Sequence, residues 1–182
     1  MKKLLVMALA VAMLATACAA GLAEDILGGP LEDFTVETID GGTFSLSGAL
    51  EDHDMVLINL WASWCPPCEM EFPYLQQAYE KYSDRVAVVA LSIEPKDTPE
   101  VLTEYAESHG MTFPVGSDSD LVLAETFKVM YIPTSVVVDR FGNVAFLDAG
   151  AQTSADAFEA LFDYFLDDNY TQTAVLDGFP SE

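Results

Sequence analysis

Basic side chains are scarce in this chain of 182 residues: seven lysines and arginines stand against 30 aspartates and glutamates, a formal net charge of −23. A surface that binds nucleic acid needs clustered Lys and Arg, so this composition argues against that function. The three cysteines are too few for a small domain held together by disulfides. The 51% of apolar residues supply enough surface for one hydrophobic core, which excludes a disordered chain.

Long apolar runs are also missing, apart from one near the N-terminus. Lys2 and Lys3 precede an apolar run of residues 4–15. This run is too short to cross a bilayer of about 30 Å as a helix. Small residues follow it, so residues 1–23 are predicted to be a secretory signal peptide, with a buried N-terminal helix as the alternative. We therefore expect a protein exported to the bacterial periplasm or cell envelope.

The end of this segment leaves two processing schemes open for Cys18. Residues 14–18 resemble a bacterial lipoprotein signal, in which the cysteine becomes the lipidated first residue, although Ala15 stands where that pattern usually has leucine. Cleavage a few residues further on would instead remove Cys18 and leave the protein soluble. In both schemes Cys65 and Cys68 remain as the two thiols able to pair in the folded domain.

The apolar pattern of residues 31–168 is typical of a single α/β domain. It predicts a mixed β-sheet with helices on both faces and an N-terminal β-hairpin. Residues 169–182 show no clear period and are predicted to be a loosely attached tail. The predicted strands are residues 34–39, 43–46, 55–61, 86–93, 135–139 and 144–147, and the predicted helices are residues 66–82, 98–108, 121–127 and 155–167.

A Cys-x-x-Cys motif lies where a predicted buried strand ends and a helix begins. Two cysteines at this spacing in a first helical turn can close a small disulfide ring, and the helix N-terminus stabilises a thiolate there. We expect Cys65 to be exposed and to attack as the nucleophile, and Cys68 to face inward as the resolving thiol. Pro66 and Pro67 remove two amide donors, so stabilisation of the first thiolate is expected from the Cys68 amide and the helix dipole.

This segment resembles a known family. Residues 59–68, Asn-Leu-Trp-Ala-Ser-Trp-Cys-Pro-Pro-Cys, are similar to the active segment of the thioredoxin superfamily, and most similar to the extracytoplasmic TlpA/ResA-like thiol-disulfide oxidoreductases. The similarity continues through residues 71–74 and 131–134. The resemblance implies a thioredoxin-like three-layer fold. It also implies a cis peptide bond before Pro133, which would lie against the cysteines beside backbone that pairs with a substrate chain.

Glu71 is the candidate proton acceptor. It follows Cys68 by three residues and so lies on the same helical face, and ResA-like proteins carry a glutamate at the matching place. Asn59 stands where cytoplasmic thioredoxins have a buried aspartate. We expect Glu71 to accept the proton of Cys68, with an ordinary solvated helix acid as the alternative. The side chains expected to contact substrate are Trp64, Pro66, Pro67, Ile132 and Pro133.

The resemblance also implies partners. These are disulfide-containing envelope proteins, such as apocytochrome c, as substrates and a membrane-embedded thiol carrier as electron donor. We expect a monomer, with no cofactor and no metal; a zinc site would need a second pair of ligands. A thiol peroxidase of the peroxiredoxin type is one alternative, although that pattern has Thr or Ser where Ala62 stands. A copper metallochaperone is another, although such proteins of this fold resemble a Cys-x-x-x-Cys spacing.

Charge is unevenly distributed along the chain. Residues 55–68 and 129–138 contain no Asp, Glu, Lys or Arg, and both segments are expected beside the cysteines. The acidic residues are therefore predicted to lie outside a neutral active patch. We expect this patch to bind substrate through apolar contacts and backbone pairing, while the surrounding acidity keeps the protein soluble and disfavours acidic partners.

Overall fold

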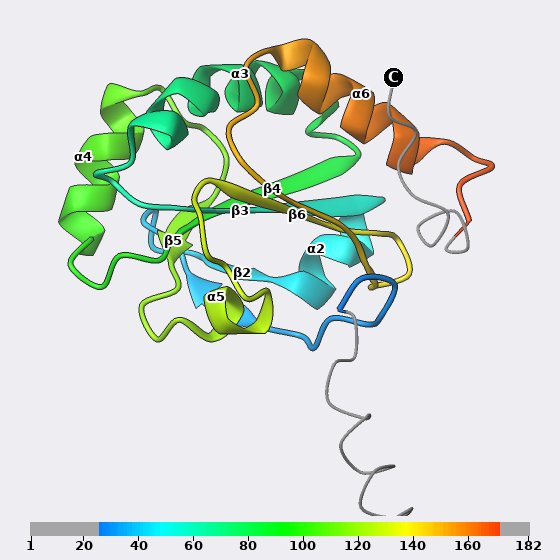
Figure 1. Ribbon diagram of the computed structural model, residues 1–182, viewed down its shortest axis with the longest axis horizontal. Helices are drawn as coiled ribbons and strands as arrows, with labels where there is room; N and C mark the ends of the chain where they lie inside the picture. Colours follow the sequence, from blue (N-terminus) through cyan, green and yellow to red (C-terminus); the bar gives the residue numbers. More distant parts are fainter. Residues whose placement is uncertain (1–25, 172–182) are drawn as a thin grey trace, which may run out of the picture.

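The computed structural model describes residues 26–171, which form a central β-sheet between two layers (Figure 1). The sheet has the strand order β5-β4-β3-β6-β7. β3, β4 and β5 pair in parallel, whereas the β3–β6 and β6–β7 pairs are antiparallel, so the predicted mixed sheet is confirmed. The strands are Met55–Trp61 (β3), Val86–Ser92 (β4), Val115–Ser117 (β5), Thr134–Val138 (β6) and Val144–Ala149 (β7).

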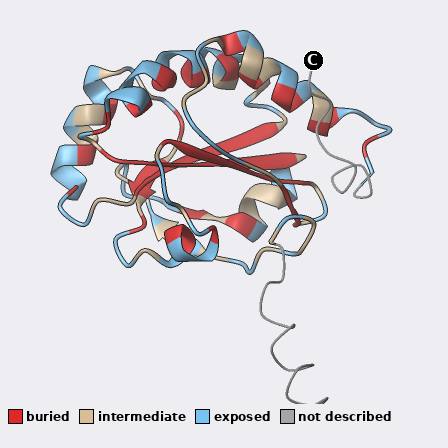
Figure 2. Cartoon of the chain, in the orientation of Figure 1, coloured by how far each residue is buried: buried red, intermediate tan, exposed pale blue. Residues whose placement is uncertain are grey.

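Two hydrophobic clusters hold the layers together, one on each face of the sheet. Met55, Leu57 and Trp61 of β3 pack into one cluster, and the intervening apolar residues of β3 pack into the other. Figure 2 shows β3, β4 and β6 buried along their length and the helices buried on their inner sides. The first cluster contains residues of α3 (Pro66–Tyr82), α4 (Pro99–Ser108) and α6 (Ala155–Leu166), and the second residues of α2 (Leu46–Asp52) and α5 (Val122–Thr126).

The N-terminal hairpin is present, but the helix that follows it was not predicted. β1 (Thr35–Glu37) and β2 (Thr43–Ser45) are antiparallel, as expected, and α2 begins directly after them. Ser45 ends the strand and also caps the helix, because its hydroxyl accepts a hydrogen bond from the Gly48 amide at 3.2 Å. A Cβ atom at Gly48 would lie 2.7 Å from that hydroxyl. The strand pattern of residues 43–46 thus gave no sign that Ser45 caps a helix. Gly48, a residue unfavourable inside helices, weakened the local signal for α2.

Strand β5 also escaped prediction, because it is short and has glycine at its centre. A Cβ atom at Gly116 would lie 2.7 Å from the carbonyl oxygen of Glu37, so this position must be glycine for β1 to approach. The bridge between Thr38 and Gly116 joins the hairpin to the edge of the main sheet. Glycine is unfavourable in an isolated strand, so tertiary contact rather than local preference forms this one.

The C-terminal part of the described chain is packed on the domain. Ser154 caps α6 as predicted, accepting from the Ala157 amide at 3.3 Å. Tyr170, which falls in the segment predicted to be a loose tail, is 7% exposed and donates to Asp139 at 2.9 Å. The predicted signal segment, its Cys18 and residues 172–182 lie outside the described residues. Within residues 26–171, no helix has the length and apolar character needed to cross a bilayer.

The packing of Tyr170 predicts that the folded domain extends past residue 168. Replacing Tyr170 with Ala should lower the free energy of unfolding by about 3 kcal/mol, since it removes a buried aromatic ring. Tyr170→Phe should cost about 1 kcal/mol for the lost hydrogen bond. Chemical denaturation measures both. Phe141→Ala, at a ring that is 59% exposed, is the matched control, and an equal loss in that variant would contradict the prediction.

Candidate active site

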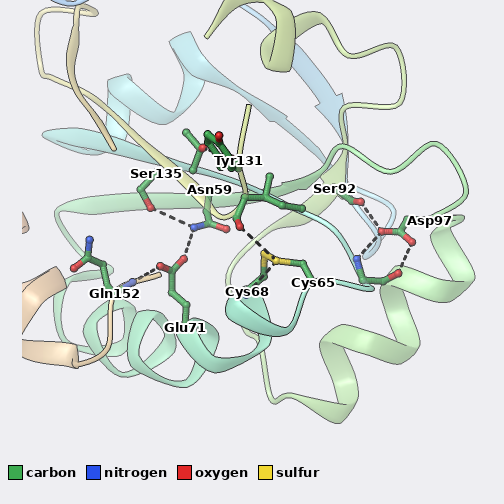
Figure 3. The surroundings of a disulfide bond; sticks show 12 residues. Asn59, Cys65, Cys68, Glu71, Ser92, Asp97, Tyr131, Ser135 and Gln152 are labelled. Atoms are coloured by element: carbon green, nitrogen blue, oxygen red, sulfur yellow. Dashed lines mark hydrogen bonds between the residues drawn. A yellow bond between two sulfur atoms is a disulfide. The ribbon is translucent and has the colours of Figure 1, made fainter. Parts of the chain in front are cut away.

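Cys65 and Cys68 form a disulfide at the N-terminus of α3 (Figure 3). Cys65 is the N-cap residue of the helix, and its Sγ accepts a hydrogen bond from the Cys68 amide at 3.2 Å. Pro66 and Pro67 fill the next two positions and supply no amide. The Cys68 amide and the partial positive charge of the helix therefore act on the first sulfur, as the sequence predicts, and favour its thiolate when the disulfide is reduced.

Cys65 is less accessible than predicted. It is 3% exposed and Cys68 is completely buried, so the expectation of an exposed first cysteine is wrong. The loop before β6 covers it, with the carbonyl oxygen of Ile132 lying 3.7 Å from Cys65 Sγ. The peptide bond between Ile132 and Pro133 is cis, as the resemblance implied. Residues some 65 positions apart in the chain thus meet at the disulfide because β3 and β6 are neighbouring strands.

Exposed apolar side chains belong to the two segments that meet at the disulfide. Trp64, Met130 and Tyr131 are 63%, 83% and 72% exposed, and they belong to the two uncharged segments that flank the cysteines. Solvent-exposed apolar groups gathered in this way mark interaction surfaces. We call these three residues the apolar rim. Of the other predicted substrate contacts, Pro66 and Pro67 are exposed, Ile132 is half-buried and Pro133 is buried.

Glu71 is buried on α3, one helical turn after Cys68, and two other elements donate hydrogen bonds to its carboxylate (Figure 3). Its Oε1 accepts from Asn59 Nδ2 of β3 at 2.7 Å, and its Oε2 accepts from the Gln152 amide of the loop after β7, also at 2.7 Å. The same Asn59 amide group reaches Ser135 Oγ of β6 at 3.3 Å. A side chain with no exposed surface is not a solvated helix acid, so that alternative is wrong.

Burial raises the pKa of Glu71 from its ordinary value of 4.5 to about 7. The hydrogen bonds from Gln152 and Asn59 act in the opposite direction, and the negative charge of Asp148 adds to the increase. At neutral pH the carboxyl group is therefore populated in both its charged and its neutral form. A group in this state can accept a proton and release it again at little cost in free energy.

Asp97 is a residue of the site that sequence reasoning missed. It is 6% exposed and accepts hydrogen bonds from the Ser63 amide at 2.9 Å and from the hydroxyl groups of Ser63 and Ser92, each at 2.5 Å. Ser63 precedes Cys65 by two residues, so Asp97 fixes the loop that carries the nucleophile. The 34 residues between Ser63 and Asp97 hide this contact, which depends on the pairing of β3 with β4.

Three acidic side chains therefore enter the site, although the sequence predicts acids outside a neutral patch. Glu71 and Asp97 come from beneath it, and Glu94 accepts a hydrogen bond from Trp64 Nε1 at 2.8 Å at its edge. The uncharged segments are as predicted, but tertiary contacts bring charged residues from elsewhere. Within residues 26–171, no group of three or more His, Cys, Asp or Glu side chains is arranged to hold a metal ion.

Comparisons with known proteins identify a matching family and relatives named as thioredoxin-like proteins or thiol-disulfide oxidoreductases. A model of the AhpC/TSA family matches residues 27–147. The thioredoxin-like protein YneN of Bacillus subtilis is 31% identical over 130 residues, which are 71% of this chain and 75% of YneN. The thiol-disulfide oxidoreductase ResA of Bacillus anthracis is 34% identical over 99 residues, or 54% of this chain and 56% of ResA. The match thus spans little more than half of ResA.

A solved structure agrees with these relatives. StoA from Bacillus subtilis superposes with a TM-score of 0.63 and 26% identity, covering 74% of this chain and 98% of StoA. The predicted thioredoxin-like fold is therefore confirmed. The matched part of this chain contains the cysteine pair and the strands and helices that position it.

The raised pKa of Glu71 predicts a pH dependence of stability. Between pH 4.5 and 7 the folded protein holds a proton that the unfolded chain has released, so stability from this group is full at low pH and falls as the pH rises. The difference amounts to about 3 kcal/mol. The unfolding free energy of the oxidised protein minus that of Glu71→Gln should therefore fall by about this amount between pH 4.5 and 8.

Urea unfolding of both oxidised proteins at several pH values measures this difference. The contributions of the other acidic residues are common to both proteins and cancel, and cysteines in a disulfide do not titrate. A difference that stays constant from pH 4.5 to 8 would show that Glu71 has the pKa of an ordinary carboxyl group.

Proposed function

Because the chain belongs to the AhpC/TSA family of thioredoxin-like proteins and is a thiol-disulfide oxidoreductase, we propose that it reduces disulfide bonds of proteins in the cell envelope. The observation that carries this proposal is the placement of Cys65 and Cys68. They form a disulfide at a helix N-terminus, one helical turn before a buried carboxyl group whose pKa burial raises to about 7. This arrangement suits two successive thiol exchanges and the proton transfer between them.

The reaction begins from the reduced protein. The Cys65 thiolate attacks one sulfur of the substrate disulfide, so that a Cys65–substrate bond forms and the second substrate sulfur leaves as a thiolate. Cys68 then loses its proton to Glu71 and attacks Cys65 Sγ. The mixed disulfide breaks, the reduced substrate leaves, and the protein retains the Cys65–Cys68 disulfide seen in this structure. An external dithiol restores the reduced form by the reverse exchange.

Glu71 supplies the base for the second step. A buried thiol loses its proton with difficulty, because burial disfavours the charged thiolate. Cys68 is completely buried, and Glu71 follows it by one helical turn. A carboxylate whose own pKa lies near 7 is a far better acceptor for a thiol proton than an exposed glutamate. Cys68 and Glu71 therefore act together, whereas Cys65 relies on the helix N-terminus.

The cellular setting follows from the sequence. The signal-like residues 1–23 support export, and Cys18 is the candidate lipid anchor. In the envelope, the substrates are proteins whose cysteines must be reduced, with apocytochrome c as the candidate, and the electron donor is a membrane-embedded thiol carrier. The apolar rim of Trp64, Met130 and Tyr131 is the surface that receives both partners, and the protein acts as a monomer.

Trapping tests this proposal. In Cys68→Ala the mixed disulfide cannot be resolved, so Cys65 should stay bonded to its substrates. When the full-length variant is expressed in its own host, envelope proteins should migrate with it on a non-reducing gel and separate from it after reduction. Mass spectrometry of the released chains identifies them.

Cys65→Ala is the matched control. It also keeps one thiol, but that thiol is Cys68, which is completely buried. It should capture far less protein. Equal capture by the two variants, or capture of nothing by Cys68→Ala, would contradict a reductase that attacks through Cys65.

A thiol peroxidase is the second candidate, and the AhpC/TSA family match favours it. In that reaction the Cys65 thiolate would attack the peroxide O–O bond and release water, and Cys68 would then convert the sulfenic acid to the disulfide with loss of a second water. Ala62 opposes this candidate. It is buried and stands where the peroxidase pattern has a hydroxyl group.

A peroxide assay separates the two activities. The reduced protein should consume hydrogen peroxide no faster than the same concentration of a simple dithiol, because no hydroxyl at position 62 activates the peroxide. Reduction of insulin disulfides by the same preparation should exceed that of the simple dithiol. Peroxide consumption tenfold or more above the dithiol would favour the peroxidase.

A further inference from the structure

Asn59 is the one polar residue of β3, and its side chain makes an unusual set of contacts. It is completely buried on the face of the sheet that carries α3. Its Nδ2 group donates to Glu71 at 2.7 Å and to Ser135 at 3.3 Å. Among the residues that the structure describes, its Oδ1 atom has no hydrogen-bond partner. A buried amide oxygen without a partner costs about 1–3 kcal/mol, so the present orientation of the amide is not held by a bond to Oδ1.

The hydrogen-bonding capacity of Glu71 changes when its carboxylate gains a proton. The charged carboxylate accepts hydrogen bonds at both oxygens, which is the arrangement seen with Asn59 and Gln152. When Oε1 carries a proton that is directed at Asn59, its O–H group meets Nδ2, which faces it at 2.7 Å and is also a donor. An O–H group and an N–H group that point at each other cannot bond, so the contact separates or the amide presents its oxygen instead.

Rotation of the Asn59 amide by 180° resolves this conflict. Oδ1 then takes the place of Nδ2 and accepts from the protonated Oε1 of Glu71. Ser135 suits either arrangement, since a hydroxyl group accepts from Nδ2 in the first and donates to Oδ1 in the second. The Gln152 amide donates to Oε2 in both. The contacts of Asn59 with Glu71 and Ser135, and that of Gln152 with Glu71, are therefore matched in either protonation state. The outer atom of the amide, which is Oδ1 in the first arrangement and Nδ2 in the second, has no partner among the described residues in either.

We propose that Asn59 is a positioning residue whose side-chain amide reverses as Glu71 takes up and releases the proton of Cys68, so that Glu71 keeps a matched hydrogen-bond partner in both states. This inference rests on the proposed role of Glu71 as the proton acceptor. The proton moves from Cys68 Sγ to Glu71 Oε1, and the rotation of Asn59 transfers no proton. The same three contacts form in both arrangements, so the rotation itself favours neither protonation state strongly.

In the described part of the chain, few charged groups lie near Glu71 besides its hydrogen-bond network. On its own helix, the titratable neighbours toward the N-terminus are the two cysteines when they are reduced. From β7, the charge of Asp148 raises the pKa of Glu71. Helix α6 also packs on α3, but its Asp163 accepts from Tyr82, eleven residues and about 16 Å along the helix. No cation is among the causes of the shift: burial raises the pKa of Glu71 most, Asp148 adds to the increase, and the neutral donors Gln152 and Asn59 oppose it.

Nuclear magnetic resonance on the wild-type oxidised protein tests the rotation directly, since cysteines in a disulfide do not titrate. At pH 9 the Asn59 side-chain amide protons should show cross-relaxation to the β protons of Ser135. At pH 5 these contacts should weaken severalfold, with a midpoint near the pKa of Glu71 of about 7. In Glu71→Gln the contacts should not change with pH. Contacts in the wild type that stay constant from pH 5 to 9 would overturn the proposal.

Kinetics provide the second measurement. The rate at which the mixed disulfide resolves should rise with pH as Glu71 ionises. Asn59→Leu keeps the volume but removes the donor to the charged form, so its midpoint should move up by about one pH unit. A purely structural role would lower the rate at every pH without moving the midpoint, and that result would overturn the proposal. Trapping by Cys68→Ala does not depend on Asn59, so the proposed function and this inference can fail separately.

Discussion

The hydrogen bond from the Cys68 amide to Cys65 Sγ, at the point where β3 becomes α3, is the contact on which the site depends. It exists because Cys65 is at once the end of the loop and the cap of the helix. β3 is buried on both faces, so the place where the loop begins is fixed. Asp97 holds the loop itself through Ser63. Cys65 is thus positioned by the strand before it, by the helix end after it and by a carboxylate from a distant part of the chain.

Beneath this junction the protein maintains a buried acid at a cost in stability. A cation next to Glu71 would lower its pKa and stabilise the fold at neutral pH, but would also make the carboxylate a weaker base. The chain instead surrounds Glu71 with an amide side chain, a backbone amide and, beyond them, a hydroxyl group. The scarcity of lysine and arginine noted in the sequence therefore has a counterpart in the site, where burial raises the pKa of Glu71 and no cation offsets that increase.

How far the sequence predicts this site depends on the distance over which each contact acts. The cysteine pair, its helix N-terminus and the helical turn to Glu71 are local, and spacing alone predicts them. Pro133 was placed by resemblance. Asp97 and Ser135 were missed, since each reaches its partner through the pairing of strands far apart in the chain. The burial of Cys65 was missed for the same reason, because the covering loop belongs to β6. Helix α2 and strand β5 were missed for a different reason. Gly48 and Gly116 lie where a neighbouring atom approaches closely, and glycine has a low preference for both helices and strands, so the local sequence did not predict either element.

Surface charge and the apolar rim act on a partner at different distances. Charges on the surface are felt over a Debye length of about 8 Å at physiological ionic strength, whereas apolar contacts act only on touching. A net charge of −23 therefore slows the approach of acidic polypeptides before any contact with Trp64, Met130 and Tyr131. Under the proposed function, the rim then contacts apolar surface beside an accessible disulfide. The proposed reductase therefore selects its substrates first by electrostatic exclusion and then by exposure of the target bond, and neither stage requires a deep pocket shaped to one sequence.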